Sequence, residues 1–213
     1  MRTLLILLKR EIEDHFVDFL VAVGVTALLI ILAVSAAYRG EEGEIPVYSG
    51  VLSLPLIVLL IVGFSGIGGN QMYADRTRKT SAFLSTLPTT RGQILAAKII
   101  MGVLAVLIVI VPLYVTAEVL WRRVMPAMPV HSGLVFNVFA VVFLMCFACY
   151  CLGLLIGRTS NRAILTLGSI LLTFVLAPLI VVKGFGYQAN IILVLFIGAS
   201  LVRTWRKFMS TSL

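Results

Sequence analysis

Long apolar stretches dominate the chain, and short segments that carry charges, glycine or proline separate them. Within these stretches the residues follow neither the alternation of half-buried strands nor the two-faced pattern of soluble helices. A helix needs roughly 20 apolar residues to cross the hydrocarbon of a bilayer, and six stretches approach that length. These stretches cover approximately residues 16–38, 51–69, 94–120, 134–156, 163–182 and 184–202. The pattern predicts an all-α integral membrane protein with six transmembrane helices.

Composition agrees with lipid as the solvent, since 61% of the 213 residues are hydrophobic and only 12% are charged. The sixth stretch is the weakest, because its uninterrupted part from Ile191 to Leu201 is shorter than a full span. It has to include the residues from Tyr187 to Asn190, or tilt very little, in order to cross. We therefore expect a transmembrane domain over 16–202 and a short cytoplasmic tail over 203–213.

The basic residues are unevenly distributed, and this distribution indicates the orientation of the chain. Lys and Arg are retained on the cytoplasmic side of short loops. With both termini in the cytoplasm, 13 of the 17 basic residues fall on that side, namely Arg2, Lys9, Arg10, Arg76, Arg78, Lys79, Arg91, Lys98, Arg158, Arg162, Arg203, Arg206 and Lys207. Topology and contact with anionic membrane lipids explain the net charge of +8, so no nucleic-acid partner is needed.

Residues 1–15 form a separate amphipathic unit before the first stretch. A secretory signal is not indicated, because the apolar run is short and charged residues follow it at once. Read as a helix, the segment has an apolar face with Leu4, Leu5, Leu8, Ile12 and Phe16, and a polar face with Lys9, Arg10, Glu13 and Asp14. We expect an interfacial helix along the inner leaflet, with a frayed tail as the alternative.

The largest cytoplasmic segment, residues 70–97, connects the second and third stretches. Residues 80–85 favour a short helix that carries the apolar pair Phe83 and Leu84 and follows a cluster of basic residues. The Leu-Pro sequence at 87–88 ends this helix, since proline removes a backbone donor and restricts the residue before it.

A second signal in the same segment marks the start of the next helix. Thr90 and Gln93 have the spacing of a capping box, which predicts a helix that begins at Arg91 and continues into the membrane. The expected result is a short helix on the membrane surface, held between two membrane-entering helices.

These residues resemble the corresponding loop of ABC type-2 (ABC-2) membrane permeases. That loop combines an acidic-basic pair, a small polar residue, an apolar helix, Leu-Pro and a Thr-x-x-(Gln/Glu)-Ile-Leu motif followed by Lys. The matching positions are Asp75, Arg76, Thr80, Phe83, Leu84, Leu87, Pro88, Thr90, Gln93, Ile94, Leu95 and Lys98. Six spans and an amphipathic amino-terminal helix agree with the family. Ser81 and Ala82 depart from it, because the family often has an acidic residue there.

The resemblance implies the permease subunit of an ABC exporter in the plasma (inner) membrane, forming half of a translocation pathway. Residues 70–97 would then include a coupling helix that contacts a separate cytoplasmic ABC ATPase subunit. The implied contact residues are Asp75, Arg76, Arg78, Lys79, Thr80, Phe83, Leu84 and Leu87. A complete exporter would need two ATPase copies, which bind ATP and Mg²⁺, and a second permease copy in a homodimer or related heterodimer.

No enzymatic activity and no cofactor are expected within this chain. A Gly-x-x-x-x-Gly-Lys-(Ser/Thr) phosphate-binding motif does not occur in it, so ATP hydrolysis is expected in the partner. Two alternatives remain beside the ABC-2 interpretation. A haem-exporter-like membrane subunit of the same superfamily fits the length and the number of spans, and a membrane scaffold without transport activity fits the topology alone.

Two further chemistries are disfavoured. Residues 63–66, Gly-Phe-Ser-Gly, resemble the nucleophile motif of rhomboid intramembrane proteases, but the only histidines, His15 and His131, lie outside the stretches and far from Ser65 in sequence. Three cysteines in the fourth stretch are expected to pack as small apolar residues and not to bind a metal, namely Cys146, Cys149 and Cys151.

Small and charged residues near the stretches predict specific contacts. Close helix packing is expected at Gly63, Ser65, Gly66, Gly69, Gly153 and Gly157. Glu118 and Arg122, four residues apart, are expected to form an ion pair. Asp18 and Lys98 begin the first and third stretches, so both are expected to reach the lipid headgroups.

Overall fold

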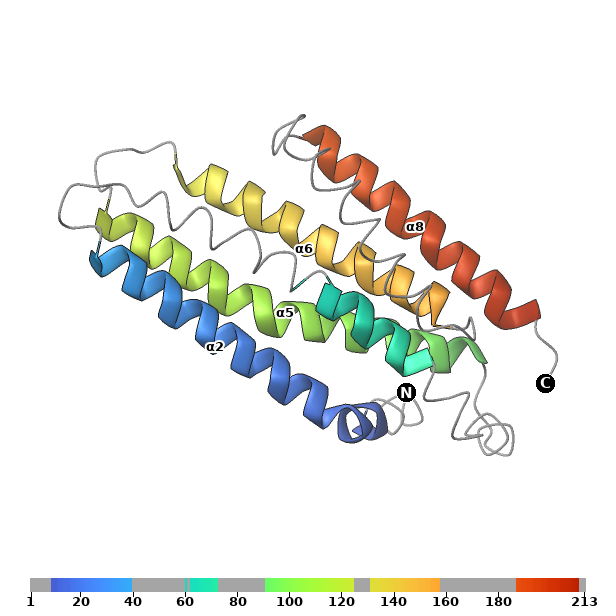
Figure 1. Cartoon of the computed structure of the whole chain (residues 1–213). Helices are drawn as coiled ribbons and strands as arrows, with labels where there is room; N and C mark the ends of the chain where they lie inside the picture. Colours follow the sequence, from blue (N-terminus) through green and yellow to red (C-terminus); the bar gives the residue numbers. More distant parts are fainter. Residues whose placement is uncertain are drawn as a thin grey trace.

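The structure is a computed structural model that describes residues 9–39, 60, 62–72, 91–124, 131–157 and 187–210. Its four long helices are α2 (Phe16–Arg39), α5 (Arg91–Val124), α6 (His131–Ile156) and α8 (Tyr187–Ser210) (Figure 1). Two shorter helical segments cover residues 9–14 and 62–72. The described part of the chain is entirely helical apart from single turn residues, as predicted.

Each long helix contains an apolar segment that is long enough to cross a bilayer. These segments are Phe16–Ser35, Gly92–Leu120, Val135–Ile156 and Gln188–Phe208. They confirm four of the six predicted stretches and establish a multi-pass membrane protein. The second stretch is described only at residues 60 and 62–69, which are helical, and the fifth, 163–182, lies outside the described residues.

The start of α5 and the end of α8 can be compared with the boundaries predicted from the sequence. Helix α5 begins at Arg91, where the capping-box pattern placed it. Helix α8 ends at Ser210, beyond the predicted end at 202, because the basic residues of the expected tail continue the helix. The weakest stretch therefore belongs to a helix of 24 residues.

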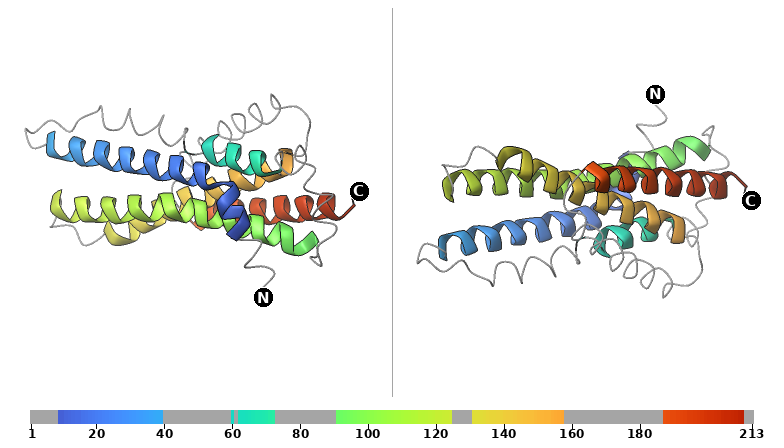
Figure 2. Two further views of the ribbon diagram at one scale, coloured as in Figure 1. Left: turned by 90° about the horizontal axis from the view of Figure 1, so that it is seen from below. Right: turned by 90° about the horizontal axis from the view of Figure 1, so that it is seen from above.

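The long helices pack in the order α2, α5, α6 and α8, and α5 also contacts α8 (Figure 1). Helices α2 and α5 begin at the end of the bundle where α6 and α8 finish, and both views in Figure 2 agree on this. Thus α2 and α5 run in one direction, while α6 and α8 run in the other. Residues 62–72 run alongside α6 in the direction of α6. The end of the bundle at which α2 and α5 begin is called the basal end.

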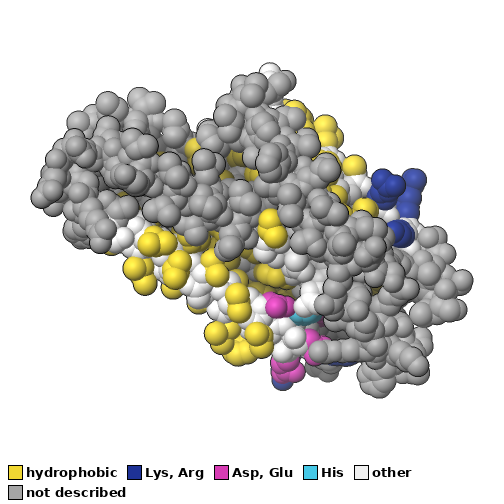
Figure 3. Space-filling view, viewed as in Figure 1, with side chains coloured by type: hydrophobic (Ala, Val, Ile, Leu, Met, Phe, Trp, Pro, Cys, Tyr) yellow, Lys and Arg dark blue, Asp and Glu magenta, His cyan; other side chains and the backbone are white. Residues whose placement is uncertain are grey.

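The core lies around α5 and α6, with α2 and α8 at the periphery. Of the residues in the most apolar stretch of each helix, 56% are buried in α5 and in α6, compared with 11% in α2 and 22% in α8. The core between the central helices includes Val106, Val109, Val141 and Met145. The outer face of α2 exposes large apolar side chains such as Leu20 and Ile31, which suits contact with lipid (Figure 3).

Candidate functional site

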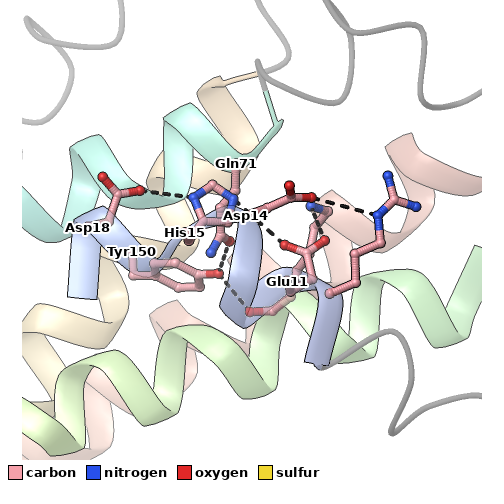
Figure 4. A network of polar contacts seen from close by, with 8 residues as sticks. Glu11, Asp14, His15, Asp18, Gln71 and Tyr150 are labelled. Atoms are coloured by element: carbon pink, nitrogen blue, oxygen red, sulfur yellow. Dashed lines mark hydrogen bonds and ion pairs between the residues drawn. The ribbon is translucent and has the colours of Figure 1, made fainter. Parts of the chain in front are cut away.

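A cluster of buried and half-buried polar side chains lies at the basal end (Figure 4). Its members come from four separate parts of the chain. They are Glu11, His15 and Asp18 at the amino-terminal side, Gln71 in the segment 62–72, Lys98 in α5 and Tyr150 in α6. Polar groups in a membrane-protein interior are costly unless they are paired, so this set, named the basal polar cluster, is a candidate functional site.

Tyr150 is the centre of one half of the basal polar cluster. Its side chain is fully buried, and its hydroxyl donates a hydrogen bond to the backbone carbonyl oxygen of Lys98 at 2.7 Å. The same hydroxyl lies 2.5 Å from Oε1 of Gln71. A tyrosine hydroxyl has a single hydrogen, so it cannot donate to both oxygens. Turning the Gln71 amide by 180° lets its NH₂ group donate to Tyr150, which satisfies both contacts.

Glycines make room for Tyr150 on both neighbouring helical segments. A Cβ atom on Gly102 in α5 would collide with the Tyr150 ring, and one on Gly68 would collide with the Tyr150 backbone oxygen. Any larger residue at Gly102 would therefore displace the ring from its place beside Lys98. The missing side chains at Gly68 and Gly102 thus leave the space in which the Tyr150 hydroxyl reaches two other helical segments.

The segment 62–72 packs against α6 along a line of small residues. A Cβ atom on Gly153 would collide with the backbone oxygen of Ser65, and one on Gly157 would lie 2.8 Å from the Cα of Gly69. These contacts confirm the packing predicted for Ser65, Gly69, Gly153 and Gly157. Gly63 and Gly66 were also predicted to pack closely, but a Cβ at either would meet nothing within 4 Å in the described part of the chain.

Lys98 forms the other half of the basal polar cluster. It is fully buried, and its Nζ donates a hydrogen bond to Oε1 of Glu11 at 2.8 Å. The prediction that Lys98 reaches the lipid headgroups is therefore wrong. The amino-terminal segment places a carboxylate beside the ammonium group, and a buried charge is retained when such a partner lies within hydrogen-bonding distance.

His15 extends the basal polar cluster along the amino-terminal segment. Its Nδ1 lies 2.9 Å from Oδ2 of Asp18, and its Nε2 lies 3.7 Å from Oε2 of Glu11. The helical segment 9–14 turns at His15 before α2 begins. Ile12 and Phe16, which were assigned to the apolar face, are exposed, and the other members of that face, Leu4, Leu5 and Leu8, lie outside the described residues.

The spacing of three polar residues in the sequence indicates this contact, although the two faces predicted for residues 1–15 did not include it. Glu11, His15 and Asp18 follow one another at spacings of four and three residues, which places them on one face of a helix. That face meets the protein through Glu11 and Lys98. The predicted polar face comprised Lys9, Arg10, Glu13 and Asp14 and did not include Glu11, His15 and Asp18, which form a set of polar contacts at the basal end.

All eight predicted coupling residues and the cap residue Thr90 lie outside the described residues. The eight are Asp75, Arg76, Arg78, Lys79, Thr80, Phe83, Leu84 and Leu87. The other cap residue, Gln93, is half-buried in the first turn of α5. Gln71 and Lys98 belong to the helical segments that flank residues 73–90, so the basal polar cluster lies at the base of the predicted coupling loop.

Residues considered for catalysis or metal binding lie in packed surroundings. Ser65 is fully buried against α6, and its Oγ has no hydrogen-bond partner among the described residues. Cys146, Cys149 and Cys151 are buried in the core of α6, in agreement with their prediction as small apolar residues. Within the described ranges, no three His, Cys, Asp or Glu side chains gather in a way that could hold a metal ion.

Comparisons of the chain with protein-family models, curated proteins and solved structures find no match. The hydrogen bonds and the ion pair of the basal polar cluster connect the amino-terminal segment, the segment 62–72, α5 and α6 at one end of the bundle.

Proposed function

We propose that this chain is the membrane permease subunit of an ABC exporter, driven by a separate cytoplasmic ATPase that contacts residues 70–97. The observation that carries the proposal is the position of Tyr150. Its hydroxyl contacts Gln71 at the beginning of this segment and the backbone of Lys98 just after its end. Both bases of the loop are thereby joined to α6, so movement of the loop would move a membrane helix.

The directions of the helices support six crossings in the proposed permease. Helix α2 ends and α5 begins at opposite ends of the bundle, and the same holds for α6 and α8 (Figure 2). A chain with this arrangement has to return across the membrane twice between these helices. We place one return in residues 51–72, where 62–72 run in the required direction, and the other in residues 163–182.

The distribution of charge supports a cytoplasmic basal end and cytoplasmic termini in the plasma (inner) membrane. The described residues at the basal end include six basic residues, namely Lys9, Arg10, Lys98, Arg203, Arg206 and Lys207. Basic residues are retained on the cytoplasmic side during insertion. This orientation brings residues 73–90 to the side where an ATPase can bind and hydrolyse ATP with Mg²⁺.

The buried contacts are suited to transmitting force. Movement of the loop bases would pass to α6 through Tyr150 and to the amino-terminal segment through the pair of Lys98 and Glu11. Water competes poorly for hydrogen bonds in such surroundings, so these contacts persist while neighbouring helices move. Two ATPase copies and a second permease copy, identical or related, would complete the exporter.

Co-purification of the ATPase from native membranes tests the proposal. We expect Phe83→Asp and Leu84→Asp to abolish co-purification, because a charge would replace the apolar contact seated in the partner. Ser81→Asp adds the same charge in the same loop, at a place where the family tolerates acidic residues, and is expected to retain the ATPase. Normal ATPase binding and stimulation in both apolar-site variants would remove the coupling assignment, and a wild-type chain without any ATPase would favour the scaffold alternative.

A further inference from the structure

Helix α5 contains a proline, Pro112, inside its apolar segment Gly92–Leu120. Proline has no backbone N–H, so the helical hydrogen bond from residue 112 to the carbonyl oxygen of Ile108 cannot form. Ile108 and Pro112 are both exposed, on a side of α5 that meets lipid, and lipid tails offer no donor in place of the missing one. The backbone of α5 is therefore weakened at this turn.

Thr116 weakens the same part of α5 further. Its hydroxyl donates a hydrogen bond of 2.8 Å to the carbonyl oxygen of Pro112, which is also the acceptor for the backbone N–H of residue 116 in a regular helix. A threonine bonded in this way slightly destabilises a helix and often bends it. Sharp bends in helices occur most often at proline. Two features that favour bending thus lie within one turn.

The part of α5 before Pro112 is held firmly in the bundle. All buried side chains described in this helix lie within the range Ile94–Ile110. Through Lys98, the basal polar cluster joins this part to α6 and to the amino-terminal segment. At its beginning, Gly92 lies so close to α8 that a Cβ atom would come within 2.9 Å of the Trp205 ring. Movement of this part would break contacts with three other elements.

The part of α5 after Pro112 is held less firmly. From Val111 to Leu120, no side chain is buried. Tyr114 meets α6 through an edge-on ring contact with Phe139, at a centroid distance of 5.4 Å. In the described part of the chain, the side-chain hydrogen bonds of this region join residues of α5 to one another. Helix α2 packs beside α5, but only 11% of the residues in its own most apolar stretch are buried. Pro112 therefore marks the boundary between an anchored and a weakly held part.

We propose that α5 bends at Pro112, so that residues 113–124 swing at the far end of the bundle, opposite the basal end, while the part before Pro112 stays in place. The swinging part is about 18 Å long at the rise of an α-helix, so a bend of about 20° moves its end by roughly 6 Å. Such a movement widens or narrows the space between α5 and its neighbours α2 and α6 at the far end (Figure 1).

In the exporter, this bend would act as a gate for cargo on the side of the membrane away from the ATPase. That role rests on the proposed function, whereas the bend itself follows from the contacts within this chain. The two statements are therefore tested separately, the bend in the chain alone and the gate in the chain with its ATPase.

Distances between spin labels on the full chain in lipid nanodiscs test the bend. One label is attached at Val119, beyond the proline, and the other at Phe136 in α6, since both positions are exposed. The background carries alanine at the native cysteines, Cys146, Cys149 and Cys151. Pro112→Ala restores the missing N–H and leaves no cavity, because Pro112 is exposed. We expect its distance distribution to be about half as wide as that of the wild type, because the bend is lost.

A second pair of labels provides the matched control on the basal side of Pro112. Ile100 in α5 and Val202 in α8 are both exposed, and both lie in the anchored region. Their distance distribution should be narrow and should remain the same in Pro112→Ala. Circular dichroism establishes that each labelled variant remains folded.

Two results would overturn the bend: equal widths for the pair at the far end in the wild type and in Pro112→Ala, or a distribution for the basal pair that is as broad as that at the far end. For the gate, ATP is added to the chain with its co-purified ATPase. We expect ATP to shift the far-end distance in the wild type and not in Pro112→Ala, with equal ATPase binding. A far-end distance that does not respond to ATP would remove the gate, and a wild-type chain without any ATPase would remove the proposed function. In both cases the distances measured in the chain alone still decide whether α5 bends.

Discussion

The apolar segments of α2 (Phe16–Ser35) and α6 (Val135–Ile156) have the same mean hydropathy, but the two helices occupy different places in the structure. In α6, 56% of the residues in the most apolar stretch are buried, compared with 11% in α2. In water, similar apolar content would drive similar burial. Lipid tails are as apolar as leucine side chains, so hydropathy places both helices in the membrane but does not decide which becomes central.

Small and polar residues account for the difference between these two helices. Helix α6 meets residues 62–72 at Gly153 and Gly157, and its Tyr150 contacts two other helical segments. In α2, a Cβ on Gly24 would meet no described residue within 4 Å, and the Thr26 hydroxyl donates to the Ala22 carbonyl oxygen of its own helix. Close backbone contact and hydrogen bonds between helices thus select α6 for the interior.

The largest effect is expected from Gly153→Leu in α6, compared with Gly24→Leu in α2. The Gly153 substitution forces a side chain into the backbone of Ser65 and should lower the free energy of unfolding by ~4 kcal/mol or more. The matched substitution at Gly24 meets open space and should leave the stability nearly unchanged. Unfolding in mixed detergent micelles measures both. Equal stabilities for the two variants would contradict the assignment of α6 as the central, closely packed helix.

The second effect concerns the buried ion pair that connects α5 to the amino-terminal segment. Lys98→Met leaves the Glu11 carboxylate without its cation and should destabilise the protein by about 3 kcal/mol. Combining Lys98→Met with Glu11→Gln removes both charges and should recover most of the loss. A double-mutant cycle of unfolding free energies provides the measurement, and strictly additive losses would show that the two side chains do not interact.

A smaller effect is expected for Tyr150→Phe, which removes the hydroxyl and keeps the ring. The Lys98 carbonyl and the Gln71 amide then lose a partner inside the protein, at an expected cost of about 1 kcal/mol. Tyr114→Phe is the matched control, because Tyr114 is only partly buried and its ring packs edge-on against Phe139. If the two substitutions cost the same, the Tyr150 hydroxyl does not hold the helices together.

Much of the fold could be predicted from the sequence, because span length and charge distribution are local properties. Four of the predicted stretches appear as helices, and α5 begins at the predicted Arg91. The end of α8 could not be placed, because apolar content decreases at Arg203 while the helix continues with basic residues. Hydropathy detects the membrane boundary, which need not coincide with the end of the helix.

The basal polar cluster was harder to predict, because its contacts join residues far apart in the sequence. Lys98 and Glu11 are 87 residues apart, and Tyr150 and Gln71 are 79 apart. No local spacing relates such partners, so Lys98 was assigned to the headgroups and Tyr150 to an ordinary apolar stretch. Glycine positions were more informative, since Gly153 and Gly157 share one helix face, although the sequence did not indicate that Gly68, and not Gly66, faces α6.

The smallest effect is expected at the exposed ion pair of Glu118 and Arg122 in α5, which the sequence predicted and the structure confirms at 3.0 Å. Arg122 is 76% exposed at its side chain, so water and salt compete with the pair. Arg122→Gln should therefore change the free energy of unfolding by less than about 0.5 kcal/mol. Arg122→Gln and Lys98→Met each remove one cation from an ion pair. Comparing their effects on the free energy of unfolding therefore shows how much of the loss depends on burial of the pair. A loss as large as that of Lys98→Met would mean that burial is not what makes the basal pair important.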